Sequence, residues 1–442
     1  MPGGFGVGVR ASRYSVAARV SQVPARGSAH PIRSLWYQVY LPNLTVATGQ
    51  GAMLPVLVYA ARAVHSTGAE AGVLVALNGF GTVLFDLPAG RITARFGERR
   101  SMYASTVMLV AGLVGCVVAR SFWVLALGVT VQAAGWALWS LVRMVHLSRV
   151  APPLVRGRAL SLFGGVIRAG NVIGPFAFVG AAGSSDVRAG FVIYLGCVIV
   201  GTIWLVLARD RHDSGATEAR AVRAHPLQVL SEHRRTFATA GVGALGVSLL
   251  RGSRTAIVPL WASHIGLDAG QAATIFALSS VVDLALFYPS GILSDRRGRR
   301  AVLLPCMALL SIGHLLVPLA HSYLALFLAA FVLGFGNGLG SGIVMTLGAD
   351  LTPAVGRASF LAVWRLFSDG GTTAGPLVDS AVVGLGAVAL AGPVMGVIGL
   401  GTTLVVALWL HEPAPAPGPG GGPALAPRRS GPTDPGPGVP DG

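Results

Sequence analysis

Long stretches without a single charged residue recur along this chain, and they restrict its fold more than any other feature. Only 11% of the 442 residues are charged and 53% are hydrophobic, whereas a soluble domain carries about 25% charged residues. About 20 apolar residues in a helix cross the hydrocarbon core of a bilayer. Since lipid offers no partner to open backbone groups, each such segment must be helical.

These stretches predict an all-α integral membrane protein with twelve spanning helices. Their approximate ranges are 40–61, 71–91, 101–119, 122–146, 157–180, 188–208, 236–262, 269–292, 301–320, 322–348, 357–379 and 386–410.

The distribution of arginine predicts how these helices are oriented. All 33 basic residues are arginine, and arginine is enriched in cytoplasmic loops. With the N-terminus in the cytoplasm, 25 arginines fall on the cytoplasmic side and only Arg62, Arg120 and Arg188 fall in outer loops. We therefore expect both termini in the cytoplasm. The net charge of +16 lies between apolar segments rather than on one face, so we expect no nucleic-acid partner.

Composition divides the chain into five parts. They are a basic cytoplasmic N-terminal arm at 1–35, a six-helix bundle at 36–208, a cytoplasmic linker at 209–235, a second six-helix bundle at 236–410 and a disordered cytoplasmic tail at 411–442. The tail is rich in proline, glycine and alanine and cannot bury a core. No short apolar core with a small-residue cleavage site precedes the first span, so we expect no signal peptide.

Four landmarks recur at an offset of 201 residues and indicate an internal duplication. The matches are Thr67-Gly-Ala-Glu70 with Asp268-Ala-Gly-Gln271, Gly90 and Gly97 with Gly291 and Gly298, Pro152 with Pro353, and Gly170-Asn-Val-Ile-Gly174-Pro175 with Gly371-Thr-Thr-Ala-Gly375-Pro376. The first match has the pattern of a helix capping box. Two parallel six-helix repeats are typical of transporters whose substrate site lies between the halves near the midplane.

The loop after the eighth helix reads Gly291-Ile-Leu-Ser-Asp295-Arg-Arg-Gly298-Arg-Arg300, and its partner after the second helix reads Gly90-Arg-Ile-Thr-Ala94-Arg-Phe-Gly97-Glu-Arg99-Arg100. The first of these loops resembles the loop signature of the major facilitator superfamily. The resemblance covers roughly residues 36–410 and implies a fold of two pseudo-symmetric six-helix bundles. It also implies a conformational latch built from Gly90, Arg95, Gly97, Arg99, Gly291, Asp295, Arg296, Gly298 and Arg299.

The resemblance implies that Asp295 closes this latch against the start of the fifth helix near Gly157. The first copy has Ala94 at the aspartate position. We therefore expect an asymmetric latch, in which Asp86 takes over part of the role. The Gly-x-x-x-Gly-Pro element of the fifth helix resembles a motif typical of proton-driven exporters of this superfamily. Close helix packing at small residues explains the element too, and the eleventh helix shares it.

Ionisable side chains inside the spans are costly to bury and usually functional. If the resemblance holds, helices two and eleven meet across the halves, as do helices five and eight. This predicts two inter-half pairs, Asp86 with Arg365 and Arg168 with Asp283, which could break and reform as the halves rock; static ion pairs are the alternative. Asp369 lies four residues after Arg365, on the same helix face. Asp283 is the first candidate for the proton carrier and Asp369 the second.

Helices one, four, seven and ten line the cavity in this superfamily. Their polar and aromatic residues are Asn43, Gln50, Gln132, Trp136, Trp139, Arg251, Arg254, Asn337 and Ser341. Trp136 and Trp139 are three apart and could stack on a flat substrate, although ordinary helix packing explains them equally well. The glycine-rich run 334–342 predicts a bend or a close approach in the tenth helix.

The first functional hypothesis is a proton-coupled, multidrug-type exporter of small organic compounds in a bacterial plasma membrane. The second is a proton-linked importer of a nutrient or organic anion, with Arg251 and Arg254 binding a carboxylate or phosphate. A transporter-like sensor or a membrane enzyme remains a remote alternative. Without lysine the chain has no phosphate-binding Gly-Lys loop, so we expect no ATP-driven transport. We expect no cofactor or metal site, and a monomer whose partners are lipid, a small molecule and protons.

Overall fold

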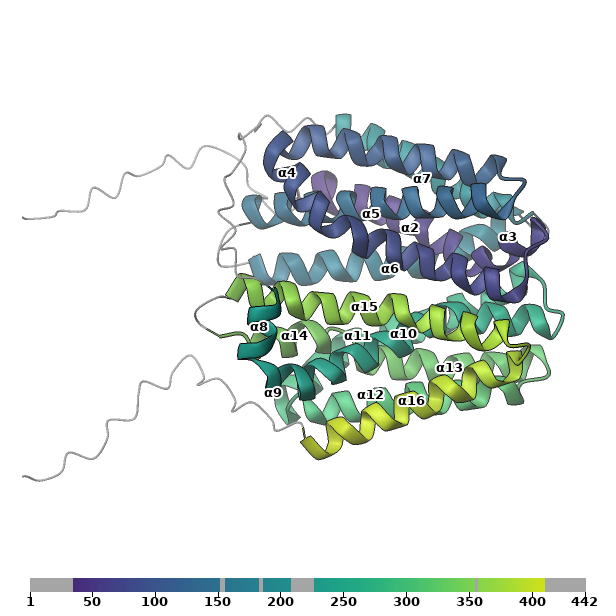
Figure 1. Ribbon diagram of the computed structural model, residues 1–442. Coiled ribbons are helices and arrows are strands. Elements are labelled where there is room, and N and C mark those ends of the chain that lie inside the picture. Colours follow the sequence, from purple (N-terminus) through teal and green to yellow (C-terminus); the bar gives the residue numbers. More distant parts are fainter. Residues whose placement is uncertain (1–34, 152–155, 183–185, 208–225, 354–356, 410–442) are drawn as a thin grey trace, which may run out of the picture.

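The computed structural model describes the chain apart from residues 1–34, 152–155, 183–185, 208–225, 354–356 and 410–442 (Figure 1). Every element in the described part is a helix, and the long helices run side by side in two stacked halves. The first six spans form one half and the last six form the other. The predicted all-α fold of twelve membrane helices is confirmed.

The N-terminal half holds spans one to six. Span one runs from a π-helical turn (Trp36–Tyr40) through α2 (Leu41–Met53) and a 3-10 turn (Leu54–Val56) to α3 (Leu57–Ala63). Spans two and three form α4 (Gly68–Val118), which changes direction at Gly97. The remaining spans are α5 (Phe122–Val150), α6 (Arg156–Ala182) and α7 (Arg188–Leu207).

The C-terminal half holds spans seven to twelve. Short helices α8 (Pro226–Glu232) and α9 (Arg234–Thr236) and a π-helical turn (Phe237–Gly241) lead into α10 (Val242–His264). The next spans are α11 (Ala269–Arg297), α12 (Arg300–Leu316) with a 3-10 turn (Val317–Leu319), and α13 (Tyr323–Leu339) with α14 (Ile343–Asp350). The last two are α15 (Arg357–Gly384) and α16 (Val388–Trp409). The end of the predicted linker is therefore helical, and Val229 of α8 is buried against the C-terminal core.

Two of the twelve spans are too polar to be recognised by hydropathy. Ten helices in the described residues are long and apolar enough to cross a membrane, and α10 and α15 are not among them. The first carries Arg251 and Arg254, and the second carries Arg365, Asp369 and Asp379. Charges of this kind lower the mean hydropathy of a span and, within a helix bundle, mark functional positions.

The duplication appears in the contacts between helices as well as in the sequence. A Cβ atom added to Gly174 of α6 would lie 2.3 Å from the Ala52 nitrogen of α2, and one added to Gly375 of α15 would lie 2.5 Å from the Ser253 nitrogen of α10. Both residues of the second contact lie 201 positions after those of the first. Glycine is therefore required where the first and fifth helices of each half touch.

Both predicted capping boxes are also present. Thr67 accepts a hydrogen bond from the Glu70 backbone, and Asp268 accepts one from the Gln271 backbone. The signature-loop glycines Gly97 and Gly298 have φ angles of 79° and 88°, which favour glycine.

The tenth span is broken where its glycine run predicts a bend. Helix α13 ends at Leu339, Gly342 adopts a φ of 79°, and α14 begins at Ile343. The break exposes the carbonyl of Gly340 to a side chain from another helix, as described below. It therefore makes a backbone carbonyl available to a charged side chain inside the membrane span.

The two halves are in contact at one end of the bundle, which we call the outer end following the arginine distribution. There the Tyr59 hydroxyl donates to the Leu267 carbonyl at 3.0 Å, and the Ser380 hydroxyl donates to the Ala69 carbonyl at 2.5 Å. These contacts seal the outer end in this conformation.

Candidate functional site

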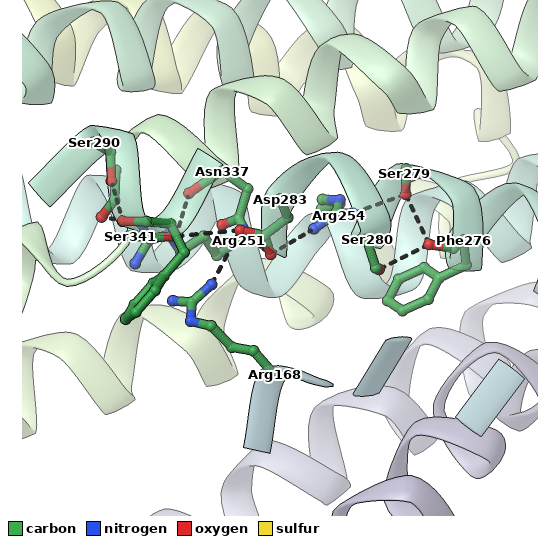
Figure 2. Close-up of polar contacts among 12 residues, drawn as sticks. Arg168, Arg251, Arg254, Phe276, Ser279, Ser280, Asp283, Ser290, Asn337 and Ser341 are labelled. Atoms are coloured by element: carbon green, nitrogen blue, oxygen red, sulfur yellow. Dashed lines mark hydrogen bonds and ion pairs between the residues drawn. The ribbon is translucent and has the colours of Figure 1, made fainter. Parts of the chain in front are cut away.

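Asp283 of α11 is the centre of a polar cluster where the two halves meet (Figure 2). Its Oδ1 accepts a hydrogen bond from Arg168 Nη1 of α6 at 3.0 Å and one from the Ser341 hydroxyl at 3.2 Å. Its Oδ2 accepts from Asn337 Nδ2 of α13 at 2.5 Å. The structure thus forms the inter-half pair expected from the sequence and adds two partners from the tenth span.

Two further arginines of α10 surround this carboxylate. Arg254 Nη1 lies 4.0 Å from Asp283 Oδ2, while its Nη2 donates to the Ser279 hydroxyl at 2.8 Å. The Arg254 guanidinium carbon also lies 5.3 Å from the centre of the Phe276 ring, a favourable cation–π distance. Arg251 Nη2 donates to the Gly340 carbonyl at 2.6 Å, at the break in the tenth span.

The cluster therefore contains three guanidinium groups and one carboxylate, with Arg254 and Asp283 largely buried and Arg168 partly exposed. Arg251 acts electrostatically on both Arg168 and Arg254, so the three positive charges share one counter-charge. Buried charges require paired partners. A change in the charge of Asp283 would consequently alter the balance of the whole cluster.

A second inter-half pair joins α4 and α15, on the side of the Asp283 cluster that faces away from the outer end. Arg365 Nη2 contacts Asp86 Oδ2 at 2.9 Å, and Arg365 Nε contacts Asp369 Oδ2 at 3.1 Å. The Arg365 side chain is 51% exposed, so water screens this group more than it screens Asp283. One arginine here serves two carboxylates, the reverse of the balance around Asp283.

The predicted cavity residues of the N-terminal half are mostly enclosed within their own bundle. Gln132 is fully buried and donates to Asn78 Oδ1 of α4 at 2.7 Å. Trp139 is also fully buried, and its ring packs towards Gly201 of α7. The stacking surface predicted from Trp136 and Trp139 is therefore not formed in this conformation, because helix packing uses the second ring.

The other N-terminal candidates, Asn43 and Gln50, are buried on α2. Neither amide atom of Asn43 has a hydrogen-bond partner among the described residues. The C-terminal candidates are those that gather at Asp283: Arg251, Arg254, Asn337 and Ser341.

The signature loops form ion-pair clusters that only partly match the predicted latch. Asp295 is 72% exposed and pairs with Arg299 of its own loop at 2.7 Å, and Arg299 Nε also contacts Asp350 Oδ2 at 2.8 Å. The contact predicted with the start of the fifth helix near Gly157 lies outside the side chains that the structure describes. In the described part, Asp295 acts within its own half.

The loop of the first half holds an equivalent cluster with the charges exchanged. Glu98 Oε1 contacts Arg149 Nη2 at 3.0 Å, and Glu98 Oε2 contacts His146 Nδ1 at 2.9 Å. Glu98 and Arg149 lie 201 residues before Arg299 and Asp350. The sequence analysis did not predict this cluster. The signal for it is that two oppositely charged residues in one half lie 201 residues before two oppositely charged residues in the other.

The remaining latch residues make local contacts. Arg95 lies over the Phe96 ring at 5.5 Å, and Arg99 Nε donates to the Tyr103 hydroxyl at 3.4 Å. Arg296 is exposed, and a Cβ atom at Gly291 would meet nothing within 4 Å. These contacts lie within the loops themselves.

Comparisons with known proteins agree with this architecture. The sequence pattern of the Major Facilitator Superfamily matches residues 40–252 and again 240–432. Multidrug resistance protein MdtH of Salmonella arizonae is 24% identical over 339 residues, which cover 75% of this chain and 81% of that protein. Myo-inositol transporter 1 of Saccharomyces cerevisiae is 27% identical over 136 residues, which cover 31% of this chain and 23% of that protein.

Solved structures share the fold at low sequence identity. A POT family transporter in complex with 5-aminolevulinic acid superposes with a TM-score of 0.70 at 12% identity, covering 85% of this chain and 96% of that chain. The family pattern matches each half in turn and together spans most of the chain. Its members are transporters rather than enzymes. The chain, with two homologous six-helix halves joined through Arg168 and Asp283, belongs to the Major Facilitator Superfamily.

Proposed function

We propose that this protein exports small organic compounds across the plasma membrane in exchange for protons. The observation that carries the proposal is the contact between Arg168 of one half and Asp283 of the other, 3.0 Å apart and close to the middle of their helices. A titratable group at this place can link protonation to the movement of one half against the other. Energy would come from the proton gradient, without a cofactor.

Protonation of Asp283 would weaken the contact between the halves. A proton on Oδ1 or Oδ2 cancels the negative charge that holds Arg168, and it leaves the guanidinium groups of Arg168 and Arg254 without a shared counter-charge. Their repulsion then favours a conformation in which the halves stand apart at this level. Release of the proton restores the ion pair and the conformation described here.

The direction of transport and the substrate class are proposed from relatives. The MdtH protein named for multidrug resistance aligns with three quarters of this chain. The Asp283 cluster suits transport in either direction, and the name of this relative supports export over import in our proposal. The arginine distribution supports cytoplasmic termini in a bacterial plasma membrane.

The excess of positive charge around Asp283 supports a second candidate, the transport of organic anions. Three arginines face one carboxylate there, and guanidinium groups bind carboxylates and phosphates in a two-pronged geometry. A substrate anion could supply the missing counter-charge at Arg251. This site favours anionic compounds over cations on electrostatic grounds.

A transport assay in proteoliposomes separates these candidates. Vesicles with an acidic lumen would be offered ethidium as a lipophilic cation and fluorescein as an organic anion, while a trapped dye reports internal pH. Wild type would be compared with Asp283→Asn and with Asp186→Asn, a matched change of an exposed carboxylate in an outer loop.

We expect accumulation of a dye coupled to proton release in wild type and in Asp186→Asn, and its loss in Asp283→Asn. Accumulation of ethidium supports multidrug export, and accumulation of fluorescein alone supports the anion candidate. Gradient-driven accumulation that survives Asp283→Asn would contradict coupling at this residue. Equal dye fluxes with and without the gradient would contradict proton coupling as a whole.

A further inference from the structure

The contact between α4 and α15 joins two carboxyl groups through a single guanidinium group. Arg365 Nη2 donates to Asp86 Oδ2 at 2.9 Å, and Arg365 Nε donates to Asp369 Oδ2 at 3.1 Å. Nε and Nη2 are neighbouring nitrogens of the planar guanidinium, whose paired N–H groups ordinarily bind the two oxygens of one carboxylate. Here they bind one oxygen from each of two carboxyl groups. The two acids therefore stand side by side, one from each half of the molecule.

The internal repeat predicts the same arrangement. Asp369 lies 201 residues after Arg168, and Phe287 lies 201 residues after Asp86. At the other interface between the halves, the Arg168 guanidinium carbon lies 5.3 Å from the centre of the Phe287 ring. The repeat therefore places Asp369 against Asp86, as it places Arg168 against Phe287. At the α4–α15 interface both of these equivalent positions carry a carboxyl group.

The two carboxyl groups are more enclosed than the arginine that joins them. The Asp86 side chain is 17% exposed and that of Asp369 is 31% exposed, against 51% for Arg365. If both acids were ionised, the three side chains together would carry one uncompensated negative charge. Neighbouring carboxylates repel each other, and one proton shared between them removes the repulsion. The group of three side chains is then neutral.

Other charged groups on the helices packed against α15 are engaged elsewhere. On α10, Arg251 and Arg254 donate to a backbone carbonyl and to a serine hydroxyl, and His264 lies at the outer end of the helix. On α14, Asp350 contacts Arg299. Helix α16 has no acidic or basic residue.

The charged groups that act on the two acids are therefore few. The remaining charged residues on helices packed against α4 or α15 are Arg62, Arg143, His146, Arg149, Arg188 and Glu232. His233, between α8 and α9, packs its ring against Phe360 of α15. In the described part of the chain, the charged groups that act on Asp86 are Arg365 and Asp369, and those that act on Asp369 are Arg365 and Asp86.

We propose that Asp86 and Asp369 share one proton and form a proton-binding site that spans the interface between α4 and α15. The proton, taken up from water, forms a hydrogen bond between an oxygen of one carboxyl group and an oxygen of the other, while Arg365 holds both. Because the two acids titrate as a pair, the proton belongs to neither alone. Its release to water restores the repulsion between the carboxylates.

Protons would consequently act in opposite directions at the two interfaces. Binding of the shared proton stabilises the contact of α4 with α15. In the function proposed above, protonation of Asp283 instead weakens the contact of α6 with α11. The site at α4 and α15 goes beyond that function, since it depends neither on the substrate nor on the direction of transport.

Infrared spectroscopy of the full-length protein in lipid tests whether the proton is shared. A neutral carboxyl group has a carbonyl band that a carboxylate lacks. At neutral pH we expect one such band in the difference spectrum of wild type minus Asp86→Asn and the same band in that of wild type minus Asp369→Asn. Either substitution leaves one carboxylate on Arg365, which needs no proton. Loss of the band in only one of the two variants, or in neither, would overturn the proposal.

The double variant and two controls sharpen this measurement. Asp86→Asn combined with Asp369→Asn should lose no more of the band than either single variant, because only one proton is shared. A loss twice as large would overturn sharing, since each acid would then hold its own proton. Asp186→Asn and Asp283→Asn should both keep the band. The readout does not use transport, so a failure of coupling at Asp283 would leave this result unchanged.

Thermal unfolding gives a second measurement. With the shared proton, the folded protein binds one more proton than the unfolded chain at neutral pH, so its stability falls as the pH rises and the proton is lost. We expect the Tm of wild type to fall from neutral to alkaline pH by more than the Tm of Asp86→Asn or Asp369→Asn. Both variants keep a balanced pair with Arg365 and should fold. An equal fall in all three proteins would overturn the proposal.

Discussion

At the scale of single residues, the decisive feature is a carboxylate that serves both halves of the molecule. Asp283 receives hydrogen bonds from Arg168 across the interface and from Asn337 and Ser341 within its own half. Removal of one partner from a buried pair leaves the other charge uncompensated. The residue is therefore a contact between the halves and, in our proposal, the group that binds the proton.

Exchange of the two charges tests whether Arg168 and Asp283 act as a pair. We expect Arg168→Asp and Asp283→Arg each to abolish transport. Each should also lower stability, by less than the ~3–5 kcal/mol that breaking a fully buried pair costs, because Arg168 is partly exposed. The double variant should recover part of the lost transport and part of the lost stability. Dye transport and thermal unfolding in detergent measure the two effects.

A matched control for this exchange is Arg188→Asp, which reverses an exposed charge at the start of α7 and should leave transport and Tm unchanged. A double variant that recovers no more than the worse single variant would show that the two charges do not compensate each other directly.

At the scale of helices, glycine decides how closely the spans approach. Gly375 brings α15 against α10, and its counterpart Gly174 brings α6 against α2. These contacts explain the Gly-x-x-x-Gly-Pro elements through packing alone, and they occur in both halves. The exporter meaning of the motif is not required to account for it.

A pair of alanine substitutions on α15 tests this packing. In Gly375→Ala the new Cβ atom would lie 2.2 Å from the Leu249 carbonyl oxygen, whereas at Gly370 it would meet nothing within 4 Å. We expect Gly375→Ala to destabilise the protein by about 1–3 kcal/mol. Gly370→Ala should be neutral or stabilise it by up to about 1 kcal/mol, because alanine favours helix. Thermal unfolding in detergent compares them, and equal Tm values would refute close packing at Gly375.

At the scale of the whole molecule, the two halves are sealed at the outer end and carry exchanged charges at the loop end. Glu98 with Arg149 in one half corresponds to Arg299 with Asp350 in the other. Duplication preserved the positions and reversed the charges, since either order of charges gives an ion pair. The outer seal can be used to trap the conformation.

A disulfide across the outer half of the interface should lock the molecule. A Cβ atom at Gly79 of α4 would lie 3.8 Å from the Thr373 Cβ atom of α15, which matches the usual separation in a disulfide. With Cys116, Cys197 and Cys306 replaced by alanine, Gly79→Cys with Thr373→Cys should form a disulfide on oxidation and lose transport. Reduction of the disulfide should restore transport.

Each single cysteine variant serves as the control and should transport normally in oxidant. A double variant that forms the disulfide quantitatively yet transports at the wild-type rate would mean that the helices need not separate here during the cycle.

Much of the fold can be predicted from the sequence because the bilayer limits which secondary structures a spanning segment can adopt. Uncharged segments of spanning length must be helices, and the 201-residue offset requires two similar halves. The pairs Arg168 with Asp283 and Asp86 with Arg365 followed from helix adjacency in the resembling family, because a charge inside a span must find a partner. These inferences depend on the spacing of charged and apolar residues, which the sequence shows directly, and on the free-energy cost of placing polar groups in lipid.

Only the tertiary structure decided which side each polar residue faces. A helix presents its side chains in all directions, so the sequence could not tell that Trp139 packs towards α7 or that Asp379 is fully buried. Nor could it show that Glu98 of α4 pairs with Arg149 of α5, since their distance depends on how the two helices pack. The membrane determines that a segment is a helix, whereas packing between helices determines which of its residues meet.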